Sequence, residues 1–391
     1  MSFVTERVED NILYLALNGH IDSSNAERVE AEIKAIRGAH PETTVIFDAA
    51  NLEYLSSAGL RVILRLRKEV AVPKIINVNT ELYEILDMTG FTDMFVVEKA
   101  FRRLSVEGCE IIAKGANGTI YRYDEETIVK IYHNGAPLEE VRLEKELCRK
   151  VFIKGINTAI PYDVVRVGEH YGSVAEMLSA KPLSKLLQAN PEKLEEYVAI
   201  YTDLLKRIHA TPIRPDEMPS MKETGVKWVK FLQPYLPADQ WEKLCNMMNA
   251  MPEPGFMIHG DYHVNNVMIQ DGEPLLIDMD TVAYGHPVFE FASVYLACVG
   301  YSECNHAGTM EFYGLPYEIT TKIWETMMKQ YFEDESVRMD VARKAQVIGY
   351  VRMMRRTIRR NGLNTPDGQE LIALCKKRLE ELLPQVEQLD Y

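Results

Sequence analysis

Polar and acidic side chains able to do chemistry are concentrated in one stretch, HGDYHVNNVMI, which runs from His259 to Ile269. Asp261 and Asn266 stand five positions apart, and Asp278 follows twelve positions later at the end of an apolar run. In phosphoryl transfer, one carboxylate orients and deprotonates the acceptor hydroxyl, while an amide and a second carboxylate hold a divalent ion. The spacing therefore predicts a base at Asp261 and a metal site at Asn266 and Asp278. Strand alternation would bring Asp280 to the same side as Asp278, so we include it in the predicted metal site.

The same stretch resembles the catalytic loop of kinases, H-R-D followed by four residues and Asn, with Gly260 in place of Arg. Taken together, the pattern is similar to the aminoglycoside phosphotransferase and choline kinase branch of the kinase-like fold. The resemblance implies a bilobal α+β domain over residues 105–391 that uses ATP and Mg²⁺ to phosphorylate a hydroxyl. Because the Arg, the DFG glycine and an APE motif are all missing, a small-molecule acceptor is favoured over a protein. The identity of the acceptor and the choice between ATP and GTP stay open.

A candidate nucleotide lobe, residues 105–180, precedes this stretch. From Cys109 the sequence reads as two strands around a turn containing Gly115 and Gly118, then a third strand that carries Lys130. Glycines in such a turn let backbone N–H groups approach phosphate oxygens, and a lysine among apolar strand residues needs an anionic partner. The resemblance implies that Lys130 binds the α/β-phosphates of the nucleotide and pairs with a Glu on the next helix.

The next helix is expected at residues 138–155. Its Glu144 has apolar residues three, four and seven positions further on, so we expect Glu144 to face the sheet and pair with the lysine, with Glu146 as the alternative. After two more strands, the resemblance places the adenine-binding backbone at Glu176 and Leu178. A helical catalytic lobe is expected over residues 181–391.

Three further features of the large lobe lie outside the catalytic stretch. The family has Gly-Asp-Pro and then an Asp that braces the catalytic loop, and here Glu290 holds the place of that Asp, without a catalytic role. His209 ends a helix, where a cationic side chain is favourable. The basic helix at residues 352–362 is either a solvated face or a patch that faces an anionic substrate or the N-terminal domain.

The first hundred residues form a separate predicted domain. Strands at residues 11–17, 44–48, 74–78 and 94–97 alternate with helices, which predicts an α/β sheet covered by helices over residues 1–100. One of these helices is expected from about Leu60 to Glu69, and another is expected to be capped by Thr80. NGHIDSSNA and FDAANLEYLSSAGLRVIL resemble the STAS domain of anti-anti-sigma factors and transporter tails. In that family a partner kinase phosphorylates a Ser at a helix N-terminus, which falls on Ser57, while Ser56 replaces the usual Asp. Ser57 is a phosphosite or simply a helix cap, and both interpretations stay open.

Bulk composition excludes several classes of function. A net charge of -14 argues against binding to nucleic acid or to an anionic membrane. The six cysteines form no CxxC pair, and the acidic N-terminus does not read as a signal peptide, so we expect a cytoplasmic protein with reduced thiols. Two alternatives to a small-molecule kinase are a protein kinase that acts on a STAS serine such as Ser57 and a nucleotide-sensing signalling module. The STAS domain would then contact the kinase domain or a partner protein.

Overall fold

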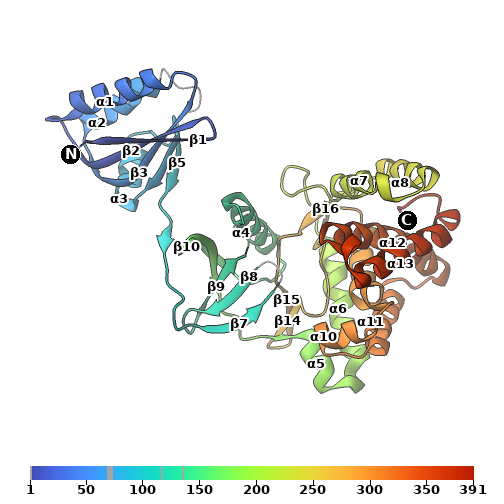
Figure 1. Cartoon of the computed structure of the whole chain (residues 1–391). Coiled ribbons are helices and arrows are strands. Elements are labelled where there is room, and N and C mark those ends of the chain that lie inside the picture. The colour runs from blue at the N-terminus through green and yellow to red at the C-terminus, as the bar shows by residue number, and fades with distance from the viewer. Residues whose placement is uncertain (1, 68–73, 116–117, 134–135) are drawn as a thin grey trace. The chain divides into compact units, whose positions relative to one another are not determined.

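The computed structural model describes residues 2–67, 74–115, 118–133 and 136–391 of the chain. The chain divides into two compact units, Met1–Leu104 and Ser105–Tyr391 (Figure 1). Within the described residues, no helix combines the length and the apolar character needed to cross a bilayer.

The first unit is one sheet with helices packed against it. Its strands lie side by side in chain order, β1 (Val4–Glu9), β2 (Ile12–Ile21), β3 (Thr44–Leu55), β4 (Lys74–Val78) and β5 (Val96–Lys99). β1 is antiparallel to β2, and every later pair is parallel. The helices are α1 (Ala26–Ala39), α2 (Ser57–Arg67) and α3 (Thr80–Met88), and a two-residue strand, β6 (Arg102–Arg103), follows. Alternate residues of β2 are buried, as one covered face requires, so the predicted α/β fold is confirmed.

Several element boundaries differ from prediction. Edge strand β1 was not predicted, because only Val4 of its six residues is buried and the rest read as a charged tail. Helix α2 begins at Ser57 rather than Leu60, and its predicted end at Glu69 lies outside the described residues. Asn79, not Thr80, caps α3, since its side chain accepts the N–H of Leu82.

The second unit begins with an antiparallel sheet that supplies the predicted small lobe. Its strands lie in the order β10-β11-β9-β8-β7. They are β7 (Glu110–Lys114), β8 (Gly118–Arg122), β9 (Thr127–Tyr132), β10 (Pro161–Val167) and β11 (His170–Glu176). Helix α4 (Leu138–Ile153) packs against β10 and β11, and its buried residues Leu147 and Val151 belong to the large hydrophobic core of this unit.

The remainder of this unit is mainly helical, which completes the predicted α+β bilobal architecture. Its helices are α5 (Leu183–Ala189), α6 (Leu194–His209), α7 (Met221–Phe231), α8 (Ala238–Ala250), α9 (Val288–Cys298), α10 (Ala307–Tyr313), α11 (Tyr317–Tyr331), α12 (Glu335–Arg359) and α13 (Pro366–Leu382), with a short 3₁₀ turn η3 (Gly300–Ser302). Short strands β12 (Lys181–Pro182), β13 (Phe256–Ile258), β14 (Val267–Gln270), β15 (Glu273–Leu276) and β16 (Ala283–Gly285) frame the site. α12 packs on α7, α9 and α13.

His209 corrects one expectation about this lobe. The residue is only 5% exposed, and its Nδ1 lies 2.9 Å from the Tyr331 hydroxyl. Burial, followed by the charge of His286, lowers the pKa of His209 to about 3. The ring is therefore neutral, and edge-on packing against Phe291 and Tyr331 explains its place better than attraction to the helix C-terminus.

Candidate active site

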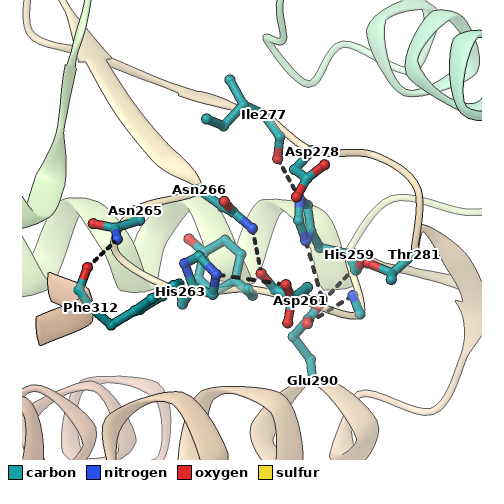
Figure 2. Close-up of polar contacts among 12 residues, drawn as sticks. His259, Asp261, His263, Asn265, Asn266, Ile277, Asp278, Thr281, Glu290 and Phe312 are labelled. Carbon is teal, nitrogen blue, oxygen red and sulfur yellow. Dashed lines mark hydrogen bonds and ion pairs between the residues drawn. The ribbon is translucent and has the colours of Figure 1, made fainter. Parts of the chain in front are cut away.

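The polar loop between β13 and β14 turns sharply at Gly260. This residue has φ +80, and a Cβ built there would lie 2.6 Å from the Thr281 carbonyl oxygen. The Thr281 hydroxyl donates to the carbonyl of the preceding residue, His259, at 2.8 Å, so the two segments are held in close approach (Figure 2). Only glycine fits both the backbone angle and the space, which explains its presence where protein kinases have Arg.

Glu290 of α9 supports this turn from below the loop. Fully buried, it accepts the His259 N–H at 2.5 Å through one carboxyl oxygen and the Gly260 N–H at 3.0 Å through the other (Figure 2). Burial raises the pKa of Glu290 to about 7, and the two backbone donors oppose that rise. The His259 ring Nε2 lies 3.0 Å from the Ile277 carbonyl, which links the loop to the segment carrying Asp278. The longer Glu therefore braces the loop as the family's Asp was expected to.

Asp261, the predicted base, is held between two basic groups. Its carboxyl oxygens lie 3.5 Å from Arg352 Nη2 and 3.6 Å from His263 Nε2. Burial alone would raise the pKa of Asp261, but His263 and Arg352 hold it below its ordinary value. Its side chain is still 39% exposed, so an ionised carboxylate faces solvent where a hydroxyl could approach.

Arg352 was not predicted as part of the site. Its Nη1 donates to the Gly260 carbonyl oxygen at 2.6 Å, and its side chain is 20% exposed. The sequence showed a run of arginines but gave no signal that α12 packs under a loop ninety-two residues earlier in the chain. The hypothesis of a purely solvated basic face is therefore wrong for this residue.

Asn266 and Asp278 lie beside the base, as their spacing suggested. Asn266 Nδ2 donates to the Asp261 backbone carbonyl at 3.0 Å, which leaves its Oδ1 as the atom able to bind a cation (Figure 2). Strand β15 ends at Leu276, and Asp278 has φ +65 in the left-handed region. The expectation that strand alternation aligns Asp280 with it is therefore wrong. A non-glycine residue held at positive φ is strained, and such strain is concentrated at functional sites.

Asp280 nonetheless interacts electrostatically with the carboxylates of the same site. Desolvation of its carboxyl, followed by the negative charges of Asp278 and Glu144, raises the pKa of Asp280 to about 7, although the residue is accessible to solvent. A divalent cation would relieve this crowding of carboxylates. Across the described ranges, no three His, Cys, Asp or Glu side chains form a metal site by themselves. The predicted ligand set therefore depends on the Asn266 amide and on phosphate oxygens, as Mg²⁺ sites of phosphotransferases commonly do.

Lys130 of β9 connects the two lobes. Its Nζ lies 2.7 Å from Glu144 Oε1 and 3.2 Å from Asp278 Oδ1. Burial alone would lower the pKa of Lys130, but Glu144 and Asp278 raise it, so the side chain is a cation. The alternative partner, Glu146, pairs instead with Lys150 at 3.3 Å. The structure thus places a partly buried cation between the nucleotide lobe and the predicted metal site.

The remaining predicted nucleotide contacts lie along the same lobe. The Gly115 N–H donates to the Gly118 carbonyl at 2.9 Å, and a Cβ on Gly118 would lie 2.6 Å from the Ile131 carbonyl oxygen. The two residues at the tip of this predicted phosphate turn, 116–117, lie outside the described residues. At the other end, the Glu176 N–H donates to the Ile160 carbonyl at 3.0 Å, so that amide is engaged within the protein. An adenine contact at Leu178 stays a prediction.

Ser57, the predicted phosphosite, lies in the first unit, at the start of α2. Its neighbour Ser56 supplies the capping contacts, with its hydroxyl accepting the Gly59 N–H at 3.4 Å and its carbonyl accepting the Leu60 N–H at 2.9 Å. Ser57 is exposed, and the first turn of α2 has no acidic residue. The structure therefore assigns the cap to Ser56 and leaves the Ser57 hydroxyl accessible.

Comparison with known proteins gives separate matches to the two units. The phosphotransferase enzyme family matches residues 108–316, and the STAS domain matches residues 4–105. BtrV of Bordetella bronchiseptica, whose name assigns it provisionally to the anti-sigma factor antagonists, is 34% identical over 92 residues. That match covers 22% of this chain and 78% of BtrV.

Solved structures similar to the chain include two aminoglycoside phosphotransferases. The gentamicin complex of APH(2'')-IIa is 14% identical with a TM-score of 0.48, covering 81% of this chain and 99% of that chain. The GDP complex of aminoglycoside 2'-phosphotransferase-IIIa is 12% identical with a TM-score of 0.48, covering 78% and 99%. A choline/ethanolamine kinase family protein from Mesorhizobium loti is 12% identical with a TM-score of 0.47, covering 71% and 92%.

Both family resemblances stated from the sequence are thus confirmed. Because the phosphotransferase match spans more than half of its 391 residues, the chain belongs to the phosphotransferase enzyme family and joins that domain to an N-terminal STAS domain.

Proposed function

We propose that the chain transfers the γ-phosphate of ATP, with Mg²⁺, to a hydroxyl of a small molecule. The observation that carries the proposal is the convergence on one site of Asp261, Asn266 and Asp278 with the partly buried cation Lys130. Lys130 lies 148 residues before Asp278 in the sequence, and together the four groups supply the parts that phosphoryl transfer requires.

Each side chain has a role that follows from its surroundings. Asp261 orients the acceptor hydroxyl and accepts its proton, because the carboxylate is ionised and open to solvent. Lys130, fixed by Glu144, binds phosphate oxygens of the nucleotide. Asn266, Asp278 and Asp280 would hold Mg²⁺, which neutralises phosphate charge when bound. Glu290 and Arg352 position the base by fixing the backbone around it.

The test is Mg-dependent ADP formation by the full chain in the presence of a panel of hydroxyl compounds, with wild type compared with Asp261→Asn. Asn keeps the size of the side chain but cannot accept the proton. We expect acceptor-dependent turnover to fall by about 10²- to 10⁴-fold, the usual contribution of a general base. Equal turnover in the two proteins would rule out Asp261 as the base.

A second candidate is a protein kinase activity toward a STAS serine, favoured by the exposed Ser57 hydroxyl at a helix N-terminus that has no acidic side chain. Labelled ATP and phosphopeptide mapping would test it, with Ser57→Ala expected to remove the label and Ser56→Ala, at the cap, to retain it. Unchanged labelling of Ser57→Ala would refute this candidate. If the chain bound nucleotide but phosphorylated neither a small molecule nor a serine, the hypothesis of a nucleotide-sensing signalling module would be favoured.

A further inference from the structure

The end of α12 is densely basic in an otherwise acidic chain. Arg352, Arg355, Arg356 and Arg359 lie on its last turns, and Arg360 follows directly. The net charge of the whole chain is -14, so this is a local excess against the overall sign. Arg352, Arg356 and Arg360 are spaced by four residues and therefore share one side of the helix.

The arginines point toward two different neighbours. Arg355 lies over the Phe231 ring at 5.8 Å, on the side of α7, and the pKa of Arg355 is lowered by burial and then by Arg359. Arg356 instead lies over the ring of Tyr301 in η3, at 5.2 Å. Arg359 thus lies with Arg355 on the side of α12 that faces α7, while Arg356 lies on the side that faces η3.

The side of α12 that carries Arg352 and Arg356 faces the proposed catalytic base, Asp261. Arg352, one turn earlier, contacts the Asp261 carboxylate, and Arg356 is close enough to help lower the pKa of Asp261. Next to Asp261, His263 packs edge-on against Phe312, a residue that is 60% exposed, with ring centroids 5.6 Å apart. An exposed aromatic ring and an arginine therefore both lie close to the base.

The arginines at the end of α12 form few ion pairs within the part of the chain that the structure describes. Considering the described residues, Arg355, Arg356, Arg359 and Arg360 have no carboxylate within 4.0 Å, and the partner of Arg352 is the base itself. Arg356 lowers the pKa of Arg360, as expected for like charges that face each other.

The nearby carboxylate of Glu303, just after η3, does not supply the missing negative charge. Its oxygens accept hydrogen bonds from Arg378 at 3.0 Å, from the Tyr295 hydroxyl at 2.8 Å and from the Tyr350 hydroxyl. Glu303 is thus already neutralised by a different arginine.

We propose that the acceptor carries an anionic group, a carboxylate or a phosphate, which Arg356 binds while Asp261 receives the hydroxyl. Arg360 adds to the attraction, and Phe312 covers an apolar part of the acceptor. A polycationic amino sugar would meet like charge in the same place, and an uncharged polyol would leave the arginines uncompensated. This inference rests on the proposed phosphotransferase function and specifies its substrate class.

The experiment compares related hydroxyl compounds with and without an anionic group, using the full chain with Mg-ATP. One set is glycerol, glycerate and glycerol 3-phosphate, a second is glucose, gluconate and glucose 6-phosphate, and choline and kanamycin are the cationic members. Wild type is compared with Arg356→Gln and with Arg359→Gln, which removes the same charge from the same helix on its α7 side. The carboxylate and phosphate members of each set identify the preferred anion.

We expect kcat/KM for an anionic member to exceed that of its neutral parent by about tenfold or more, since a charge-assisted bond contributes that much. Arg356→Gln should raise the KM for that acceptor by about tenfold and leave the KM for ATP within about twofold. Arg359→Gln should change neither by more than about twofold. If only the neutral or cationic acceptors were phosphorylated, and Asp261 were required for it, the inference of an anionic acceptor would be overturned and the proposed function would stand. A raised KM for ATP in Arg356→Gln would assign the arginine to the nucleotide and overturn it as well.

If none of these compounds is phosphorylated, a binding measurement still tests the proposed anion site. Titration calorimetry of glycerol 3-phosphate and glucose 6-phosphate into the full chain should give affinity that weakens about tenfold in Arg356→Gln and not in Arg359→Gln. Binding that is absent, or equal in the two variants, would refute the anion site. Anion binding without turnover would instead contradict the phosphotransferase proposal and leave the site standing.

Discussion

Replacing Glu290 by Gln tests whether this buried carboxyl sets the geometry of the catalytic loop. Its two oxygens accept the His259 and Gly260 N–H groups, and water cannot replace either bond because the residue is 0% exposed. Gln keeps one acceptor oxygen but presents an amide N–H to the other backbone N–H. An unpaired buried donor costs about 1–3 kcal/mol, and here two donors oppose each other, so we expect a loss of stability near the upper end of that range.

Tryptophan fluorescence can follow this change in the relevant unit alone, because all three tryptophans lie after residue 105, at Trp228, Trp241 and Trp324. Urea unfolding of Glu290→Gln should show the loss, while Glu380→Gln, the same change at an exposed position of α13, should stay within about 0.5 kcal/mol of wild type. Turnover should fall as well, since the loop carries Asp261. A Glu290→Gln variant with wild-type stability and turnover would refute the bracing role.

Three further changes test other parts of the site. Glu144→Gln removes the partner of Lys130 and should raise the KM for ATP about tenfold, whereas Glu146→Gln, two residues away, should leave it unchanged. Gly260→Ala places a Cβ 2.6 Å from a carbonyl oxygen at φ +80, so we expect a stability loss of about 1–3 kcal/mol in urea unfolding and a lower kcat. His209 has a folded pKa of about 3, below its ordinary value, so its contribution to stability is complete above about pH 6.5 and is lost as the pH falls. Between pH 7 and pH 5 wild type should lose about 2 kcal/mol more than His209→Gln, and equal losses would show that the histidine is not held neutral.

Local patterns in the sequence predicted much of the fold and part of the site. The pairing of Glu144 with Lys130 could be inferred because helix periodicity shows which glutamate faces the sheet, and the structure places the two 2.7 Å apart. The alternation of strands and helices likewise predicted the α/β fold of the first unit. These inferences succeed because they depend on neighbours within a few turns of one helix or within one strand.

Contacts between distant segments could not be predicted in this way. Arg352 reaches Gly260 across ninety-two residues, and nothing in the local pattern of α12 indicates which loop lies beneath it. Strand β1 was missed because an edge strand buries too little apolar surface to show an alternating pattern. The left-handed backbone at Asp278 was missed because its position after an apolar run reads as more strand.

The order of strands in the first sheet has a consequence for synthesis. Each of the strands β2 to β5 pairs with the strand made just before it, so this unit can complete its sheet as soon as β5 leaves the ribosome. The catalytic loop, in contrast, depends on a residue made later. Its Gly260 carbonyl accepts a hydrogen bond from Arg352, which is translated ninety-two residues after it. During translation a folded STAS domain should therefore exist well before the attached phosphotransferase-family domain can complete its catalytic loop.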